Sequence, residues 1–562
     1  MNLPDKKHNT FTRSISKFKG LNRLPVPEDG ELTEVMNLSF DFYPVMFPVN
    51  EHLLVDEAEN TDIGGGIINA NGTLAWVKNG TLYYDGNATG LTGLSTTEVK
   101  SMVEFWGKIF IFPDKKYYDI AADTYGDIGT SNDPDDPSMC PDMDYVCVHN
   151  NRIWGVGGNT IYASRLGWAL GAADSTVETI ASTTITSGQW TETEDQTMLE
   201  SDEYAVSNKI IGGYTYVVTF DNTEYRCVAG VASNGKTGIG SMGLDFADYP
   251  FFITVYPDGG SYKGRTYIAN GVPASHTFSA IEDGKHGWTS FIDATGYPDD
   301  AGSFVQDFAS EGEFIGICSW DDRIVALKPR CHHEVMGSYP STFSVTTVSK
   351  TGTTDNRSIC EVDGRLYYAS FGGMYSYAGG VEQNISRKVM IAPGAVCCGT
   401  DGTHLYVCDD AGNLFVYDAA RGIWSQQSQG NFISMAFLNG AVFAMDYIGS
   451  VYALNCDDNK VSEWSFTFND YNETVYNQND IRKIVLKMKA RKDTKIKIEL
   501  LADKETDGRS FSREYIVKPY DMKEISFPLN RAAEHDIRVS GDNYVWIYGF
   551  KLTGKDGGEN IV

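Results

Sequence analysis

The sequence has no apolar run that approaches the roughly 18 residues needed to cross a bilayer as a helix. Its first residues, Met1 to His8, are mostly polar and lack the apolar centre of a secretory signal peptide. We therefore expect no membrane insertion, and we expect the protein to be made and to stay in a cytoplasm until it assembles.

Helical periodicity is also scarce, because no stretch longer than about 15 residues keeps apolar side chains at spacings of three and four. The composition instead includes 32 Tyr and 28 Phe, with many Thr, Val and Gly. These residue types suit half-buried strands joined by tight turns. The predicted fold class is all-β, and a length of 562 residues predicts about three to four domains.

Paired cysteine motifs are missing, since the ten cysteines include no CxxC. Six of them lie inside apolar, strand-like runs, where a thiol packs as a small hydrophobic group: Cys147, Cys318, Cys360, Cys397, Cys398 and Cys408. We expect reduced thiols, as in a cytoplasmic protein.

Basic residues are far fewer than acidic residues in positions 1–462. The formal net charge is −29, yet residues 463–562 carry 17 basic and 17 acidic side chains, so the whole negative excess lies in residues 1–462. Such a surface repels phosphate, and we expect no tight binding of nucleic acid. A contribution to solubility alone is the simpler interpretation.

A repeat runs through most of the chain. Each copy is an apolar strand, a polar turn such as Asn-Gly or Asp-Gly, and a second strand rich in aromatic and β-branched residues. The seven copies are Leu74–Tyr84, Met102–Phe112, Tyr145–Val156, Ile315–Leu327, Ile359–Ala369, Val396–Val407 and Ile433–Ala444. Several copies continue into a third strand, as in Gly372–Tyr377, and linking segments are available for a fourth.

The spacing of the copies predicts the architecture. The turns at Asp322, Gly364, Gly402 and Gly440 follow one another at nearly equal intervals of roughly 40 residues, close to the length of a propeller blade. We predict a β-propeller of about seven blades, each too thin to bury both faces alone. A set of unrelated hairpins in sandwiches is the alternative.

One interval, from Asn151 to Asp322, is several times longer than a blade and breaks this rhythm. Its ends, Ile161–Trp168 and Gly287–Phe291, are interpreted as the two parts of one interrupted blade. The intervening residues 169–286 are predicted to form an inserted β-sandwich that projects from the propeller and carries a docking or binding surface.

The composition changes after Leu454. Alternating strands over Ile484–Ala490 and Lys495–Leu500 form a predicted hairpin within a C-terminal β-sandwich, residues 463–562. Its row of lysines could form a nucleic-acid or membrane patch. We favour the solvated face of amphipathic strands, offset by acidic neighbours.

The remaining segments complete the predicted order of domains. Residues 1–35 are interpreted as a polar, basic arm that orders on assembly, and Asn37–Tyr43 as the strand that closes the ring. Residues 36–168 and 287–462 are then the first and second parts of the propeller.

Three segments resemble a known family. Gly372–Ser386, Thr33–Ser39 with the following Pro44 and Pro48, and Ser164–Trp168 are similar to sequences in bacteriophage stabilisation or tail-hub (nozzle) propeller proteins. The resemblance covers most of residues 33–455 as an architecture, through short and degenerate motifs.

The resemblance implies a structural component of a phage virion rather than an enzyme. It implies a ring of copies at the tail hub, nozzle or head-to-tail joint, in contact with portal, adaptor and tail-fibre proteins and assembled in the bacterial host cytoplasm. DNA would pass through the lumen without specific binding, and an acidic wall would repel it at short range. The family brings no catalytic residue, cofactor or metal site.

Residues with catalytic or metal-binding potential are few. Cys331-His332-His333-Glu334 holds possible metal ligands, but neighbours on a strand point to opposite faces, so an ordinary turn is the preferred interpretation. Acidic groups that could hold Ca²⁺ are interpreted as solvated loops or turns: Asp133-Pro-Asp-Asp136, Asp142, Asp144, Asp409-Asp410 and Asp457-Asp458. We assign no catalytic, cofactor or metal residue.

A second function remains open. Some glycosidases use propellers and a pair of carboxylates, and 75 acidic residues allow many such pairs. The alternative is therefore a carbohydrate-binding or glycan-cleaving propeller, such as a module that binds a host receptor. Aromatic and acidic residues gathered on one face would favour it.

Overall fold

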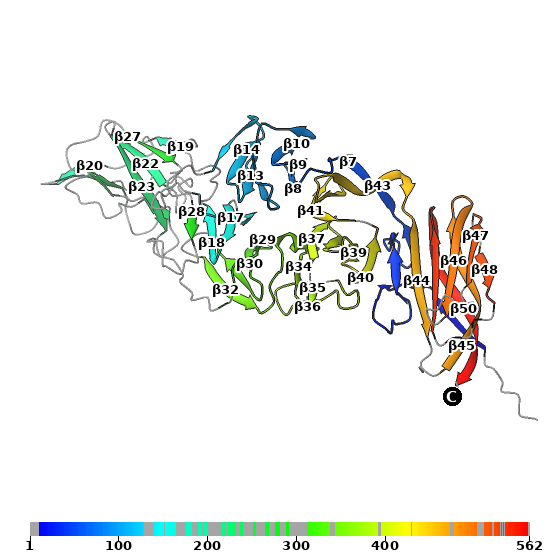
Figure 1. Ribbon diagram of the computed structural model, residues 1–562. Helices are drawn as coiled ribbons and strands as arrows, with labels where there is room; N and C mark the ends of the chain where they lie inside the picture. Colours follow the sequence, from blue (N-terminus) through cyan, green and yellow to red (C-terminus); the bar gives the residue numbers. More distant parts are fainter. Residues whose placement is uncertain are drawn as a thin grey trace, which may run out of the picture. The chain divides into compact units, whose positions relative to one another are not determined.

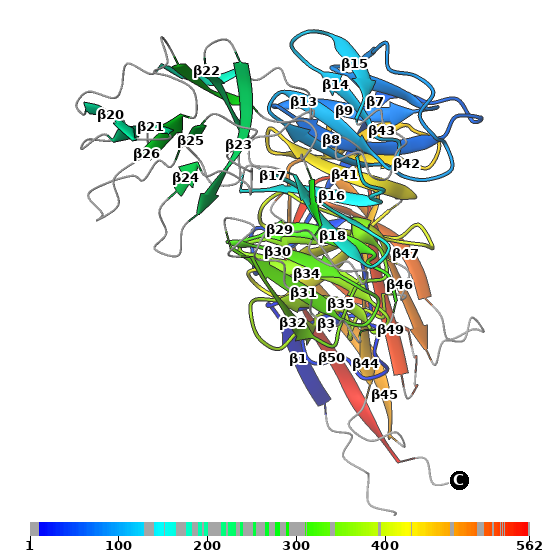
Figure 2. The same cartoon turned by 90° about the vertical axis from the view of Figure 1, so that its left-hand side faces the viewer.

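The computed structural model is built almost entirely of strands and turns (Figures 1 and 2). It describes residues 10–128, 140–150, 152–164, 310, 312–337, 343–391, 395–428, 430–471, 477–502, 511–519, 522–528, 530, 532 and 534–559, with the backbone of strands β19 to β28 inside residues 176–290. Among these residues the regular elements are strands, apart from a 3₁₀ turn at Asn356–Ser358. The fold is all-β, as predicted. It divides into two compact units, residues 1–99 with 351–562 and residues 100–350.

In the first unit, three antiparallel meanders each use four consecutive strands. They are β8 (Gly64–Ala70), β9 (Thr73–Lys78), β10 (Thr81–Tyr84) and β11 (Asn87–Ala88); β33 (Cys360–Val362), β34 (Arg365–Ser370), β35 (Gly373–Tyr377) and β36 (Gln383–Asn384); and β37 (Ala395–Thr400), β38 (His404–Asp409), β39 (Leu414–Asp418) and β40 (Ile423–Gln427). The meanders agree with the predicted repeat of strand, turn and strand.

The turns between the first two strands use the residues that the sequence indicated. Asp363 and Gly364 have φ of +50° and +70°, and Asn439 and Gly440 have φ of +51° and +85°. Both central residues of such a two-residue turn need left-handed backbone, which Gly, Asn and Asp tolerate best. Local turn chemistry therefore sets these hairpins.

The first repeat was predicted one strand out of phase. The hairpin Leu74–Tyr84 joins the second and third strands of its sheet, and the first strand is β8, which pairs with β9. The sequence prediction missed β8 because it begins with three glycines. A Cβ on Gly64 would lie 2.4 Å from the carbonyl oxygen of Asp446, so this close approach of backbone requires glycine.

A fourth meander takes one strand from the far end of the sequence. It consists of β41 (Phe432–Leu438), β42 (Ala441–Asp446) and β43 (Val451–Val461), with β7 (Asn50–Asp56) added antiparallel to β43. The prediction that Asn37–Tyr43 supplies this strand was wrong. Asn37 has a φ of +55° that breaks an extended run, and Leu38–Ser39 (β5) pairs instead with Phe47–Pro48 (β6).

The C-terminal residues form two sheets around one apolar core. One has the order β1 (Thr10–Ile15), β50 (Val545–Glu559), β45 (Asn477–Ala490) and β48 (Met522–Ser526); the other contains β4 (Glu34–Met36), β44 (Trp464–Tyr471), β49 (Glu534–Gly541), β46 (Thr494–Ala502) and β47 (Phe511–Val517). Ile484 and Leu486 from the first sheet share a buried cluster with Ile496 and Ile498 from the second. Figure 1 shows the strands of the two sheets running side by side.

The predicted hairpin of the C-terminal region needs correction. Its two strands, β45 and β46, lie in different sheets. The alternation along β46 agrees with the prediction, because Ile496 and Ile498 are buried while Lys495 and Lys497 are exposed. A short connection joins the two strands, and the shared apolar core places them in facing sheets.

Within the segment that was predicted to be an arm that orders on assembly, residues 10–35 already pair with the rest of the chain, whereas residues 1–9 lie outside the described residues. Strand β1 pairs with β50 from Thr10 to Ile15, and β2 (Gly20–Leu21) pairs in parallel with β3 (Glu31–Leu32). Phe18, Leu21 and Leu32 are buried in the core of the C-terminal sheets. These widely spaced apolar side chains anchor a segment that is polar on average.

Strand β4 joins a meander to the C-terminal region. It pairs in parallel with β40 and antiparallel with β44, so that β37 to β40 continue into a nine-stranded sheet. The side chain of Glu34 accepts hydrogen bonds from Thr467 (2.7 Å) and Arg538 (3.0 Å) across this joint.

The second unit holds three more meanders. Their strands are β12 (Ser101–Phe105), β13 (Lys108–Phe112), β14 (Lys116–Asp119) and β15 (Thr124–Asp127); β16 (Tyr145–His149), β17 (Arg152–Gly157), β18 (Thr160–Ser164) and β28 (Trp288–Ser290); and β29 (Gly316–Trp320), β30 (Arg323–Leu327), β31 (His332–Met336) and β32 (Ser344–Ser349). Apolar side chains pack between neighbouring sheets, for example Trp154 against Phe343 with ring centroids 5.1 Å apart.

The middle meander of this unit is interrupted where the sequence predicted. Ser164 pairs with Trp288 and Tyr162 with Ser290, so the fourth strand returns after the insert. The described strands of the insert form two antiparallel sheets. One contains β19 (Thr176–Ala181), β27 (His276–Ile281), β22 (Thr215–Phe220), β23 (Thr223–Val231) and β24 (Thr237–Ile239), and the other β20 (Gln189–Thr193), β21 (Gln196–Glu200), β26 (Arg265–Ile268) and β25 (Phe251–Ile253).

Candidate functional site

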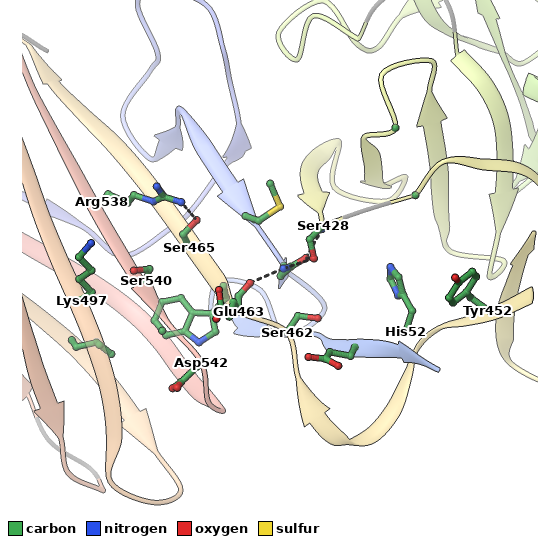
Figure 3. Close-up of a pocket in the computed structure, with 18 of the residues that line it drawn as sticks. His52, Ser428, Tyr452, Ser462, Glu463, Ser465, Lys497, Arg538, Ser540 and Asp542 are labelled. Atoms are coloured by element: carbon green, nitrogen blue, oxygen red, sulfur yellow. Dashed lines mark hydrogen bonds between the residues drawn. The ribbon is translucent and has the colours of Figure 1, made fainter. Parts of the chain in front are cut away.

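A cleft of about 1140 Å³ in the first unit is the main candidate site. One wall is the outer face of the C-terminal sheet, with side chains from β44, β46 and β49. The other wall comes from β7 and from the meander of β41, β42 and β43. Figure 3 shows Lys497, Arg538 and Ser540 on the first wall, and His52 and Tyr452 across the cleft from them.

The charged groups of the first wall are paired with one another. Lys495 lies 2.7 Å from Glu514, and Lys497 lies 2.7 Å from Glu499. Arg538 also hydrogen-bonds to Ser465 (3.2 Å). This wall therefore offers compensated charges at a solvated sheet face, which agrees with the favoured interpretation of the lysine row for Lys495 and Lys497.

Three serines that line the cleft, Ser428, Ser462 and Ser465, form hydrogen bonds within the fold. Ser462 donates to the carbonyl of Asn50 (3.1 Å), and Ser465 donates to Glu34 (3.1 Å). The amide of Asn37 donates to Ser428 (2.9 Å) and to the carbonyl of Glu463 (2.6 Å), the links drawn in Figure 3. Hydroxyls engaged in this way are not arranged as activated nucleophiles.

The opposite wall is partly aromatic. His52 accepts a hydrogen bond from the backbone N–H of Asn455 through Nδ1 (3.1 Å), and its ring packs edge-on against Phe432 (6.1 Å between centroids). Tyr447 lines the same cleft and is 61% exposed. The cleft thus suits a polar ligand with one flat face better than it suits group-transfer chemistry.

A smaller cavity of about 380 Å³ contains an imidazole held between two carboxylates. His404 lies 2.9 Å from Asp401 through Nδ1 and 3.0 Å from Asp41 through Nε2. Burial alone would lower the pKa of His404, but the hydrogen bonds to Asp401 and Asp41 raise it to about 10. Burial opposes ionisation of Asp401, yet hydrogen bonds from His404 and from the backbone hold its pKa well below the usual range.

This cluster is a charged clamp. A general base must be neutral at working pH and must present a free ring nitrogen, whereas His404 is protonated and both nitrogens are engaged. Asp41 follows β5, while His404 begins β38, so the clamp ties the N-terminal segment to the meander. Sequence reasoning missed it because Asp41 and His404 lie far apart along the chain; only the short Asp401-Gly-Thr-His404 spacing was available as a signal.

The segment Cys331–Glu334 enters and forms strand β31, and is not the ordinary turn that was preferred. His333 contacts Thr347 through Nδ1 (3.0 Å), while Glu334 accepts from Arg323 (2.8 Å). Burial, reinforced by Lys328 and His332, lowers the pKa of His333 to about 4. Among the described residues no three His, Cys, Asp or Glu side chains converge as metal ligands.

Acidic residues at turns accept backbone hydrogen bonds. Asp409 accepts from the N–H of Asn413 (2.8 Å), and Asp446 accepts from the N–H groups of Gly449 (2.9 Å) and Ser450 (2.8 Å). Asp410 follows Asp409 in the same turn. These carboxylates take the place of backbone carbonyls in holding the turns.

The other acidic candidates separate in space. Asp457 and Asp458 lie within β43 and not at a turn as predicted, because β43 extends to Val461 alongside β7. Asp142 forms an ion pair with Lys115 (2.5 Å), and the backbone of Asp144 bonds to Val156 (2.8 Å). Asp133–Asp136 lies outside the described residues.

The nine cysteines whose side chains are described are free thiols. Burial raises the pKa of Cys140 and of Cys360 to about 12, so these thiols stay protonated and unreactive near neutral pH.

The part of the chain that the structure describes contains no helix long and apolar enough to span a bilayer.

The solved structures that are similar to this chain match it only weakly. No family model matches the chain, and no curated protein matches it. Among solved structures, BamB from Moraxella catarrhalis is 10% identical and covers 72% of this chain and 97% of its own, with a TM-score of 0.30. YCF48 from Cyanidioschyzon merolae is 11% identical and covers 73% and 99%, with a TM-score of 0.26. Likenesses of this strength carry no argument about function.

Proposed function

We propose that the seven four-stranded meanders are the blades of one β-propeller and that the chain is a non-enzymatic structural subunit of a bacteriophage tail hub, nozzle or head-to-tail joint. The C-terminal sheets and the insert would be β-sandwich appendages. The observation that carries the proposal is the recurrence of one strand order in seven sheets, together with a last sheet completed by β7. Borrowing a strand from the other end of the sequence is one way to close a circular array of blades.

The chemistry of the described sites supports a structural role. The acid–base groups that would attract a catalytic interpretation are already engaged, as with the doubly bound imidazole of His404 and the serines around the cleft. Buried side chains that are satisfied in this way stabilise an architecture, and they are not poised to bind a reacting atom.

The charge distribution fits passage of DNA without binding. All of the negative excess lies in residues 1–462, which include the proposed blades. Repulsion of phosphate would act within about 8–10 Å of an acidic wall at physiological salt. An experimentally determined ring with a neutral or basic lumen would contradict this part of the proposal.

Electron microscopy of the full chain tests the main proposal. We expect rings when the chain is produced with the portal or adaptor proteins encoded beside it, and tail-located density in the assembled particle. Absence of the chain from purified particles, or a genetic neighbourhood of polysaccharide-degrading enzymes, would overturn the assignment. A monomer of the isolated chain would not, because ring assembly can require a partner ring.

A second function, recognition of carbohydrate, is favoured by one observation. The exposed ring of Tyr447 and the carboxylates of Asp446 and Glu51 line the same cleft. Sugar C–H groups pack on aromatic faces, and carboxylates accept hydrogen bonds from sugar hydroxyls. A saturable glycan-array signal lost in Tyr447→Ala would support this function, and no signal with the wild-type chain would remove it.

A further inference from the structure

Two buried cysteines face each other across a pair of strands in the first unit. Cys397 on β37 is the cross-strand partner of Cys408 on β38. Neither side chain is exposed, and both belong to the same buried cluster. Residues directly opposite each other in an antiparallel pair have Cα atoms about 4.5–5.5 Å apart, within the range of about 4.4–6.8 Å that a disulfide spans. The backbone therefore holds this pair at the separation that a disulfide requires.

The two side chains also point toward the same segment of the chain. The Sγ of Cys397 donates a hydrogen bond to the carbonyl of Phe432 (3.2 Å), and the Sγ of Cys408 donates to the carbonyl of Gly430. The two thiols are within hydrogen-bonding distance of each other as well. Strand register and side-chain contacts thus agree that the two sulfur atoms lie side by side. We call Cys397 and Cys408 the thiol pair.

The members of the thiol pair differ in acidity. The hydrogen bond from Cys397 lowers the pKa of Cys408, although burial opposes this shift. Burial, followed by the hydrogen bond to Cys408, raises the pKa of Cys397 well above its usual range. Because the thiolate is the reactive form of cysteine, Cys408 is the member that attacks an oxidant. Cys397 is the member that stays protonated beside it.

The thiol pair lies directly behind the wall of the main cleft. Gly430, Asn431 and Phe432 line this cleft, and the carbonyls of Gly430 and Phe432 contact the two sulfur atoms. A single segment of chain therefore separates the pair from the cleft. The register of β37 and β38 shifts between Ala395 and Cys397, so the ladder is irregular beside the pair. Local opening here admits a molecule close to water in size more readily than a bulky oxidant.

We propose that Cys397 and Cys408 form an oxidation site, at which hydrogen peroxide closes a disulfide between β37 and β38. The Cys408 thiolate attacks one peroxide oxygen, the O–O bond breaks, and hydroxide leaves a sulfenic acid on Cys408. The sulfur of Cys397 then attacks the sulfenic sulfur, the S–O bond breaks, and the oxygen leaves as water with the Cys397 proton. Two thiols and one peroxide give one disulfide and two waters.

The bond changes the contacts behind the cleft as well as the strand pair. It ties β37 covalently to β38, and it removes both S–H donors from the carbonyls of Gly430 and Phe432. Oxidation of the thiol pair therefore alters the hydrogen bonding of residues that line the cleft. The inference goes beyond the proposed function and does not rest on it, because it needs only the fold of the first unit.

Peptide mapping of the folded full chain tests the inference. The chain is treated with hydrogen peroxide, its remaining thiols are alkylated in denaturant, and it is digested without reduction for mass spectrometry. Cys397→Ala and Cys408→Ala each remove one member of the thiol pair. Cys398→Ala is the matched control, since Cys398 is buried on the same strand but belongs to the other core cluster and faces away from Cys408. Circular dichroism establishes that each variant is folded.

We expect one linked peptide, Cys397 to Cys408, in the wild-type chain and in Cys398→Ala, and its complete loss in both variants of the thiol pair. The intact mass should fall by two hydrogen atoms, and a dithiol reductant should restore it. In Cys397→Ala a sulfenic acid should persist on Cys408, where dimedone traps it. In Cys408→Ala the remaining Cys397 should stay unmodified, because burial keeps its thiol protonated.

Three outcomes overturn the inference. The first is sulfinic acid on Cys408 of the wild-type chain with no linked peptide, because a resolving thiol beside it would have intercepted the sulfenic acid. The second is a link that forms in urea but not in the folded chain. The third is a link from Cys408 to Cys398 in place of Cys397. Mapping of the wild-type chain decides among these results even if a variant fails to fold.

Discussion

The clamp of His404 between Asp401 and Asp41 allows a sharp test of the electrostatics. Replacement by glutamine, His404→Gln, keeps a hydrogen-bonding side chain but removes the positive charge, and two carboxylates then face each other without a cation. A charge-assisted hydrogen bond contributes about 1.5–3 kcal/mol. The bond to Asp41 is discounted because that side chain is 46% exposed. We therefore expect the opening free energy of β38 and of residues 38–44 to fall by about 2–3 kcal/mol near pH 6.

The pH dependence of this difference follows from the direction of each pKa shift. The pKa of His404 is raised from 6.5 to about 10, so its contribution is complete below pH 6.5 and disappears as the pH rises toward 10. The pKa of Asp401 and of Asp41 is lowered, so their contribution is present above their unfolded pKa near 3.8 and is lost as the pH falls through the folded values. The clamp should be most stabilising between pH 4 and 6.5.

Hydrogen exchange measured by mass spectrometry gives the opening free energy of β38 and of residues 38–44 separately from the rest of the chain. A local measurement is needed because the chain has two compact units, which need not unfold together. The protection lost in His404→Gln should shrink between pH 7 and 10, after correction for intrinsic exchange rates. His149→Gln serves as control, because burial lowers the pKa of His149 and gives it no such dependence. A constant difference over this pH range, or an NMR titration of His404 near pH 6.5, would refute the reasoning.

Three further outcomes follow from the second unit and the core. Trp106→Asn should stabilise the chain by about 1 kcal/mol, because Trp106 has a φ of +52° and is 61% exposed at a turn position that suits Asn; a lower midpoint in urea would contradict this. Acidification from pH 6.5 toward 4 should raise hydrogen exchange around β31, since buried His333 stays neutral while the unfolded chain takes up a proton; unchanged protection of the β31 peptide at pH 5 would argue against it. Leu486→Ala should cost about 2–5 kcal/mol of unfolding free energy and exposed Lys495→Ala less than about 0.5, and similar midpoints for the two would show that the C-terminal core is misassigned.

The sequence predicted best what local chemistry determines. Pairs such as Asp363-Gly364 and Asn439-Gly440 specify a hairpin within a few residues, so the meanders and their turns could be predicted. The interrupted meander was recognised because the interval from Asn151 to Asp322 is far longer than one blade. The alternation of Lys495 and Lys497 with buried isoleucines was equally visible.

Long-range partners could not be predicted from such signals. Both Asn37–Tyr43 and Asn50–Asp56 have enough apolar residues to form an edge strand, and only the contact with β43 decides between them. Gly64 looks like part of a loop until the carbonyl of Asp446 is seen beside it. The clamp could not be predicted for the same reason, because no sequence pattern connects Asp41, which precedes β6, with His404 at the start of β38.

The pairing of the N-terminal strands with the end of the chain has a consequence for synthesis. Strand β7 pairs with β43, β4 with β44 and β1 with β50. Most of the chain is therefore translated before these N-terminal strands can pair. At about 5–20 residues per second that delay is tens of seconds. During this time the backbone edge of β7 is unpaired beside Leu53, Leu54 and Val55, which stay exposed even in the folded chain, and such an edge can pair with the wrong strand. The newly made protein should therefore depend on chaperones until its last strand leaves the ribosome.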